Sequence, residues 1–376
     1  MRLNGKPMEA KLELKELTKR FGTVGAVSGL SLIAREGEFL SLVGPSGCGK
    51  STTLAMIAGL LQADGGDIVI DKRVVNDLPA QQRGVGLVFQ DYAVFTSLSV
   101  EANLAFGLEV RGVSRVARKK LVKALAEQLN LTSLLKRRGG SLNMSEMQRV
   151  ALARVLIVEP KLLLLDEPMS NLDASVRASL RGELRQIQRA RGQTVFYVTH
   201  DQAEALSMSD RIAVMRGGKL LQIGTPEEIY QRPSNRFVAE FIGDPPINVI
   251  ACDVRRDGGS IAVDVPGFGN VAVGRGIIDE GRHLIGVRPH DVIVGHASTP
   301  GAIQTTVRFI ENFGAEHVLH LEYLNELIRA TTVPGFAHVG ANVYMGFDMT
   351  HAHLIEAGTD RIVPIDALSP NAKDRH

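Results

Sequence analysis

One short segment constrains the fold of this chain more than any other feature of its sequence. Residues 44–52 read Gly-Pro-Ser-Gly-Cys-Gly-Lys-Ser-Thr, after an apolar strand-like run at 38–43 and before an apolar helix-like run at 52–60. Glycines have no Cβ, so successive backbone N–H groups can turn inward around an anion, and the following helix adds the positive end of its dipole. The strand, the loop and the helix together predict a phosphate-binding loop, or P-loop.

The residue types in this loop fit a nucleoside triphosphate and Mg²⁺. Lys50 supplies a positive charge for the β- and γ-phosphates, and the Ser51 hydroxyl is placed to ligate Mg²⁺. Cys48 is interpreted as a small loop residue and not a catalytic thiol, because no histidine partner can be assigned to it. The other predicted nucleotide-binding residues of the loop are Gly44, Pro45, Ser46, Gly47, Cys48, Gly49 and Thr52.

Two further strand ends carry polar groups that we expect beside this loop. Four leucines at 162–165 form a buried-strand pattern that ends at Asp166 and Glu167, and a later apolar run ends at Thr199 and His200. The carboxyl ends of parallel strands meet at one edge of a sheet. There Asp166 can hold Mg²⁺, directly or through water, Glu167 can polarise the attacking water, and His200 can contact the γ-phosphate.

The first part of the chain predicts an α/β fold. The full length of 376 residues is enough for two or three domains of about 150 residues each. A stretch from about 99 to 156 is almost entirely helical and predicts an inserted helical subdomain. The other helical runs alternate with apolar ones, which is typical of a largely parallel sheet, and we predict its inner strands at 38–43, 84–89, 161–166, 194–199 and 211–215.

A Pro/Gly cluster at 243–246 predicts the boundary between two domains, 1–242 and 243–376. Two short helices are expected just before it, one starting at Thr225 and the other running from Asn235 to Ile242. Beyond the cluster, short β-rich runs alternate with turn residues. This pattern predicts a small all-β accessory domain, either a barrel or a sandwich.

Charge and composition exclude several classes of protein. The net charge is only +2, so we expect no nucleic-acid partner, and basic clusters at 111–123 and 136–138 are interpreted as solvated helix faces. No apolar run reaches the roughly 20 residues that cross a bilayer, and the opening residues lack a secretion signal. Two cysteines favour a reducing cytosol.

The pairs His317/His320 and His351/His353 have no partner at a recognised ligand spacing and predict no metal site.

These motifs together resemble the ATPase subunits of ATP-binding-cassette (ABC) transporters, from about Lys11 to Val363. The resemblance is to the type that serves bacterial sugar and glycerol-3-phosphate importers, such as the maltose system. It implies a RecA-like core with an antiparallel β subdomain and an inserted helical subdomain, followed by a small OB-like accessory domain. It also implies ATP and Mg²⁺ as cofactors, and ATP hydrolysis coupled to import of a carbohydrate or polyol.

The resemblance assigns roles to residues outside the P-loop. Phe21 matches the aromatic position that stacks on adenine, and Gln90 matches the loop glutamine that touches Mg²⁺ and water and couples to the membrane subunits. Residues 170–173 match the loop across the dimer interface, and His200 matches the switch histidine. Residues 286–290, Gly-Val-Arg-Pro-His, resemble a recurrent element of the accessory domain.

One motif of the family is substituted. Where the family has Leu-Ser-Gly-Gly-Gln, this chain has Leu142, Asn143, Met144, Ser145 and Glu146, followed in register by the expected helix. In the family, this helix start reaches across a head-to-tail dimer to the γ-phosphate on the other subunit. We expect the Met144 side chain to crowd that approach and Glu146 to add negative charge beside the phosphate, while Asn143 can still donate a hydrogen bond. Weakened function and neutral drift are both open interpretations.

The resemblance implies a subunit bound peripherally to the cytoplasmic face of the inner membrane. Its implied partners are integral-membrane permeases, a second ATPase subunit in a homodimer or heterodimer, and indirectly an extracytoplasmic solute-binding protein. The substituted motif favours a partner with an intact one. Two alternatives stay open, a regulatory nucleotide-binding subunit with little turnover and a soluble cassette ATPase that acts on nucleic acid or ribosomes. The single P-loop and the low net charge disfavour the second.

Overall fold

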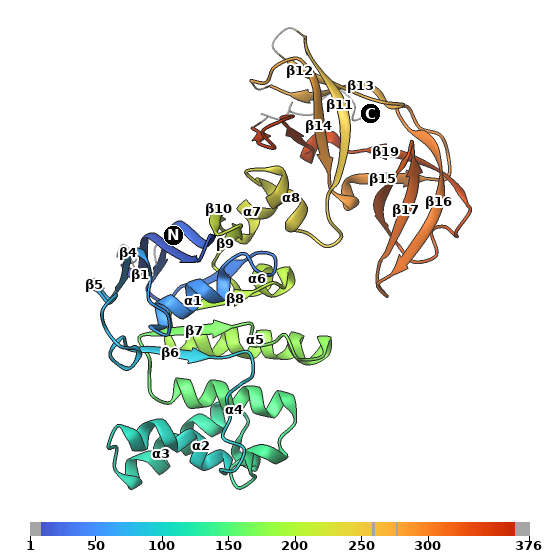
Figure 1. Cartoon of the computed structure of the whole chain (residues 1–376). Helices are drawn as coiled ribbons and strands as arrows, with labels where there is room; N and C mark the ends of the chain where they lie inside the picture. The colour runs from blue at the N-terminus through green and yellow to red at the C-terminus, as the bar shows by residue number, and fades with distance from the viewer. Residues whose placement is uncertain (1–8, 258–259, 276, 365–376) are drawn as a thin grey trace. The chain divides into compact units, whose positions relative to one another are not determined.

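The chain divides into two compact units. The computed structural model describes residues 9–257, 260–275 and 277–364, and the first unit ends at Pro226 while the second begins at Glu227 (Figure 1). The sequence predicts the boundary later, at 242/243. The difference concerns the short helices α7 (Pro226–Gln231) and α8 (Arg236–Phe241). They group with the second unit because its buried Arg288 guanidinium donates hydrogen bonds to the carbonyl oxygens of Tyr230, Ala239 and Ile242.

A six-stranded sheet organises the first unit, in the order β10-β9-β3-β8-β7-β6. All of its pairings are parallel except β9 with β10. The five apolar runs predicted from the sequence form β3, β6, β7, β8 and β9, but β6 lies at an edge of the sheet, where the sequence predicted an inner strand. The strands are β3 (Phe39–Val43), β6 (Val85–Val88), β7 (Leu162–Asp166), β8 (Val195–Thr199), β9 (Arg211–Arg216) and β10 (Lys219–Gly224).

Both faces of this sheet are covered, which explains why its strands are apolar at nearly every position. Successive side chains of a strand point to opposite faces. Leu163 shares an apolar core with Leu180 of α5 (Ala174–Arg191). Leu164 lies in a second core with Leu54 of α1 (Lys50–Ala58). Because β3, β8 and β7 are adjacent and parallel, the loops that follow them lie at one edge of the sheet.

Two smaller elements complete the first unit, and both are predicted by the family resemblance. An antiparallel sheet in the order β2-β1-β4-β5 shares the core of α1. Three helices between β6 and β7 form the inserted helical subdomain, with Ser99, Ser114 and Asn143 as their N-caps. The elements are β1 (Ala10–Phe21), β2 (Val24–Arg35), β4 (Gly65–Ile70), β5 (Arg73–Val74), α2 (Val100–Val110), α3 (Arg115–Gln128) and α4 (Met144–Leu156).

The second unit is built from antiparallel strands, as its turn-rich sequence predicts. Its sheets have the orders β13-β12-β11-β14-β20-β21 and β15-β19-β16-β17-β18, and both contribute to one apolar core. The strands are β11 (Asn248–Asp257), β12 (Ser260–Val265), β13 (Gly269–Gly274), β14 (Gly281–Val287), β15 (Val292–Gly295), β16 (Ile303–Asn312), β17 (His317–Tyr323), β18 (Glu326–Thr332), β19 (Asn342–Phe347), β20 (His353–Ile355) and β21 (Ile362–Val363). Across the described residues of the chain, no helix combines the length and apolar character needed to cross a membrane.

Candidate functional site

The loop at 44–52 joins β3 to α1 and depends on glycine at two positions. Gly49 has φ 106°, in the left-handed region, and a Cβ added there would lie 2.2 Å from the backbone oxygen of Ala26. A Cβ at Gly44 would lie 2.2 Å from the backbone oxygen of Met215. Both contacts are with backbone, which cannot move aside as a flexible side chain can. Gly44 and Gly49 are thus required by close packing, and Gly49 also by its φ.

Replacement of Gly49 by alanine is expected to destabilise the first unit by about 3 kcal/mol or more, because it adds an overlap with backbone to an unfavourable φ. Gly47 is the matched control, with φ 77° and nothing within 4 Å of an added Cβ. Gly47→Ala is expected to cost only about 1 kcal/mol. Urea unfolding followed by circular dichroism measures both, and equal losses of stability would contradict the assigned packing.

Lys50 is held inside the loop by the loop's own carbonyl groups. Its side chain is buried, and its Nζ donates hydrogen bonds to the backbone oxygens of Gly44, at 2.7 Å, and Pro45, at 3.1 Å. A cavity of about 210 Å³ has Lys50 in its lining. It is lined by Ala26, Ser46, Gly47, Gly49, Lys50, Ser51, Thr52 and Glu167. The predicted phosphate loop and one of the two predicted strand-end acids therefore share a cavity.

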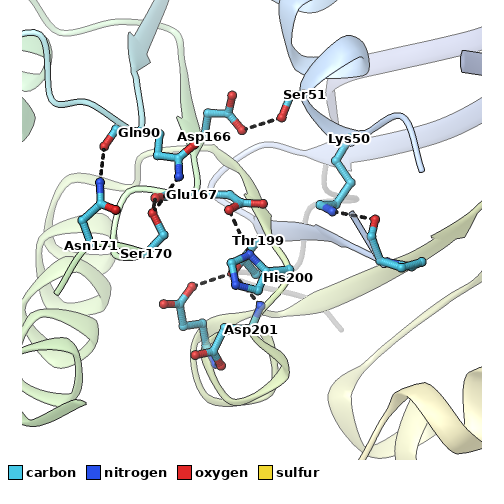
Figure 2. Close-up of polar contacts among 12 residues, drawn as sticks. Lys50, Ser51, Gln90, Asp166, Glu167, Ser170, Asn171, Thr199, His200 and Asp201 are labelled. Carbon is cyan, nitrogen blue, oxygen red and sulfur yellow. Dashed lines mark hydrogen bonds and ion pairs between the residues drawn. The ribbon is translucent and has the colours of Figure 1, made fainter. Parts of the chain in front are cut away.

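Ser51 and Asp166 form the pair that the sequence assigns to Mg²⁺. The Ser51 hydroxyl donates a hydrogen bond of 3.1 Å to Oδ1 of Asp166, at the end of β7 (Figure 2). Burial raises the pKa of Asp166, and the negative charge of Glu167 raises it further. A hydroxyl and a carboxylate so close together are oxygen ligands of the kind that Mg²⁺ prefers. The geometry therefore fits the predicted ion.

Glu167 faces His200 directly. Oε2 of Glu167 lies 2.9 Å from Nδ1 of His200, so residues at the ends of the adjacent strands β7 and β8 meet (Figure 2). Glu167 has φ 43°, an unfavourable conformation for a residue with a side chain. Such strain persists only where surrounding contacts hold it, here a hydrogen bond from its N–H to the oxygen of Val198. The carboxylate is fixed between the cavity and the imidazole.

Glu204 is a buried residue beside this site that the sequence motifs do not reveal. It accepts hydrogen bonds from the hydroxyls of Tyr197, at 2.6 Å, and Thr199, at 2.7 Å. Burial raises the pKa of Glu204. The local pattern Asp-x-x-Glu at 201–204 is typical of a helix capping box. Only half of that box forms, because Asp201 accepts from the N–H of Glu204 while the Glu204 side chain turns inward. Glu204 thereby fixes Thr199, the residue before His200.

Gln90 packs against the loop at 170–171, and among the described residues its side chain has no hydrogen bond to the Ser51–Asp166 pair. Its Nε2 donates to the Ser170 hydroxyl at 3.2 Å, and the Asn171 side chain donates to its backbone oxygen at 3.4 Å (Figure 2). Phe21 is 52% exposed at the end of β1, with the Lys19 ammonium 5.7 Å from its ring centre. Among the residues that the structure describes, neither Gln90 nor Phe21 lines the cavity of Lys50.

The substituted motif at 143–146 forms a complete capping box at the start of α4. Asn143 Oδ1 accepts from the N–H of Glu146, and Glu146 Oε2 accepts from the N–H of Asn143, both at 2.9 Å. Glu146 also forms an ion pair of 3.0 Å with Arg137. The negative charge of Glu146 is therefore paired with Arg137 within the chain. Met144 is 47% exposed, and Ser145 follows it in the first turn.

Comparisons with known proteins decide the family. Residues 27–170 match the family described as ABC transporter. The chain is 38% identical to the sn-glycerol-3-phosphate import ATP-binding protein UgpC 1 of Rhizobium johnstonii, over 94% of this chain and 96% of that protein. It is 40% identical to the trehalose/maltose import ATP-binding protein MalK of Thermococcus litoralis, over 94% of this chain and 100% of that protein. The chain belongs to the ABC transporter family.

Solved structures agree with this assignment. The ABC transporter component cbiO1 of Clostridium perfringens superposes with a TM-score of 0.56 at 27% identity, over 59% of this chain and 90% of that one. A nucleotide-free ATP-binding cassette from an ABC transporter superposes with a TM-score of 0.53 at 24% identity, over 58% of this chain and 93% of that one, and shows the fold alone. The predicted P-loop fold is confirmed, and this ABC transporter subunit is an ATPase that binds ATP.

Proposed function

We propose that this ABC transporter ATPase binds Mg²⁺-ATP in the cavity over Lys50, hydrolyses it with Glu167, and thereby drives import of a carbohydrate or polyol. The observation that carries the proposal is the position of Glu167, which lines the cavity beside the P-loop and contacts His200 at 2.9 Å. The names of the relatives support the cargo, because they are import proteins for glycerol 3-phosphate and for trehalose and maltose.

Each polar residue of the site has a distinct part in this proposal. Lys50 and the N–H groups of the P-loop hold the β- and γ-phosphates. Ser51 and Asp166 hold Mg²⁺, which neutralises phosphate charge when it is bound. Glu167 accepts a proton from the attacking water, and His200 holds Glu167 in place and contacts the γ-phosphate. Gln90 and Phe21 take the roles of their family positions, toward the metal and the membrane subunits and toward adenine.

The proposed assembly is peripheral to the cytoplasmic face of the membrane. Integral-membrane permeases bind the ATPase, and an extracytoplasmic protein delivers the solute to them. The relatives named as import ATP-binding proteins support this arrangement. All proposed nucleotide contacts lie in the first unit, which ends at Pro226. The second unit therefore serves regulation or assembly, not nucleotide chemistry.

The sequence at the start of α4 bears on whether the second ATPase subunit is a copy of this chain or a different protein. In the family this helix end offers N–H groups to the γ-phosphate bound by another subunit. Here the exposed Met144 side chain adds bulk where the family has glycine, and the acidic Glu146 stands in the first turn. In a homodimer both sites would carry this defect. We therefore propose an asymmetric pair in which a second ATPase supplies an intact motif.

Restoration of the family motif is expected to raise the ATPase rate of the purified chain at least about tenfold, the gain from regaining one or two contacts to a charged group. The variant combines Asn143→Ser, Met144→Gly, Ser145→Gly and Glu146→Gln. It removes the Met144 side chain and the Glu146 charge, and steady-state phosphate release measures the rate. Arg137→Gln is the matched control, because it breaks the ion pair with Glu146 and keeps the capping box.

Brisk hydrolysis by the unmodified chain, with no gain from the restored motif, would favour neutral drift over an asymmetric pair. Slow hydrolysis that the restored motif does not increase would instead support the alternative of a regulatory subunit with little turnover. The capping box itself contributes about 1 kcal/mol of stability. The restored variant is therefore compared at a temperature at which both proteins are folded by circular dichroism.

A further inference from the structure

Three potential metal ligands from two separate segments meet in the second unit. Asp291 ends the short helix η4 (Pro289–Asp291), while Asp348 precedes the short helix η5 (Met349–His351). One ligand atom from each of Asp291, Asp348 and His351 lies within 4.8 Å of the others. The sequence pairs His351 with His353 and predicts no metal site, because it does not show that Asp291 is brought to η5.

The backbone fixes this meeting independently of the side chains. The N–H of Asp348 donates a hydrogen bond of 2.8 Å to the backbone oxygen of Asp291. Oδ1 of Asp348 accepts from the N–H of Thr350 at 2.9 Å, which orients its carboxylate at the start of η5. The two carboxylates are therefore close because of the fold, despite their mutual repulsion.

Asp291 has an oxygen that the protein leaves without a partner. The residue is only 8% exposed, and its Oδ2 is buried without a hydrogen bond in the described structure. A buried carboxylate oxygen without a donor is costly, and an unlocated water or ion is one of the few explanations for it. Arg288 acts on Asp291 through its charge, but its hydrogen bonds go to the carbonyl oxygens of Tyr230, Ala239 and Ile242.

Two imidazoles flank the Asp291 carboxylate, one near each of its oxygens. Nε2 of His290 lies 3.7 Å from Oδ2 of Asp291, and Nδ1 of His351 lies 3.8 Å from Oδ1. These distances are too long for hydrogen bonds. Ligand atoms at about 2.1 Å from a tetrahedral ion are about 3.4 Å apart, so small side-chain movements would complete such a site. Both histidines are exposed, which gives an ion a path from solvent.

We propose that Asp291, Asp348 and His351, with His290 as a fourth ligand, bind a divalent transition-metal ion, with Zn²⁺ as the best fit. Mg²⁺ and Ca²⁺ take oxygen ligands almost exclusively, whereas Zn²⁺ takes both imidazole nitrogen and carboxylate oxygen. The bound ion ties η4 to η5. Its ligands His290 and Asp291 follow shortly after Arg288 in the sequence. The hydrogen bonds of Arg288 hold α7 and α8 to the β-rich core.

The test compares Zn²⁺ binding by matched variants of the full-length, untagged protein, stripped of metal and free of nucleotide. Isothermal titration counts equivalents of Zn²⁺, with Mg²⁺ and Ca²⁺ as comparison ions. The double variant Asp348→Asn/His351→Ala is expected to lose one equivalent that the parent binds. His338→Ala, which removes an exposed histidine elsewhere in the unit, should keep it. Because Zn²⁺ at the P-loop site or at other histidines would be common to all three proteins, the difference reports the proposed site.

A second measurement needs no variant. Anomalous scattering at the zinc edge from crystals of the parent should place a peak within bonding distance of Asp291 and His351.

Asp348→Asn alone, which keeps the side-chain shape, should lower Zn²⁺ affinity at least about tenfold. Equal stoichiometry and affinity in all variants, or a peak confined to other residues, would overturn the site. Binding of Ca²⁺ or Mg²⁺ as tightly as Zn²⁺ would overturn the choice of ion.

Discussion

Glu167→Gln is expected to bind ATP as tightly as the parent chain and to lose at least about a hundredfold in turnover, the usual contribution of a general base. The amide keeps the size of the side chain and can still contact Nδ1 of His200, which lies 2.9 Å from the carboxylate in the parent. It cannot accept a proton from water. The rate is measured by phosphate release and the affinity by titration with a fluorescent ATP analogue.

A loss of turnover can be measured only if the parent protein hydrolyses ATP fast enough. The parent homodimer is expected to be slow because of the motif at 143–146, so Glu167→Gln is also made in the chain with the restored motif. Glu183→Gln is the matched substitution elsewhere in the first unit, at an acid that pairs with Arg149 3.0 Å away and lines no part of the P-loop cavity. Parental turnover by Glu167→Gln would remove Glu167 from its proposed role.

Lys50→Ala is expected to weaken ATP binding itself, by at least about tenfold, because a buried hydrogen bond to a charged group contributes about 1.5–3 kcal/mol. The Lys50 ammonium is held by the oxygens of Gly44 and Pro45, and the residue lines the cavity. Its removal takes away the cation nearest to the proposed phosphates. Equilibrium titration with ATP measures the loss, with and without Mg²⁺.

Lys120→Ala is the control for charge, since Lys120 is an exposed residue of α3 in the same unit. It should leave ATP affinity unchanged, while Lys50→Ala lowers it. Loss of folding in Lys50→Ala is checked by circular dichroism, and Lys50→Arg, which keeps the charge but not the shape, should recover only part of the affinity. Undiminished ATP affinity in Lys50→Ala would contradict the assignment of the loop.

The first unit could be predicted from the sequence because its signals are local. Strands buried on both faces are apolar at consecutive positions, so β3, β7 and β8 are evident as runs. The loop at 44–52 needs glycine where Gly49 packs against backbone. Once the strands are parallel neighbours, the meeting of Ser51 with Asp166 and of Glu167 with His200 follows from the order of the sheet.

The contacts that the sequence did not predict join residues that are distant along the chain or whose local pattern indicates another role. Glu204 sits in a capping pattern, yet its side chain is drawn inward because the hydroxyls of Tyr197 and Thr199 need an acceptor in a buried place. Arg288 holds α7 and α8 to the second unit through backbone oxygens, which carry no sequence signal. Asp291 and His351 meet only because η4 and η5 are joined by the fold.

One measurement tests the proposed nucleotide site most directly, a crystal structure of Glu167→Gln with ATP and Mg²⁺. The chain has a second cavity of about 210 Å³, lined by residues 61–66 and by Ile68, Asn76, Asp77 and Arg83, which offers an internal comparison of equal size. We expect the β- and γ-phosphates to contact Lys50 and the P-loop N–H groups, with Mg²⁺ on Ser51 and Asp166. Nucleotide bound in the second cavity, or phosphates that avoid Lys50, would contradict the proposed site.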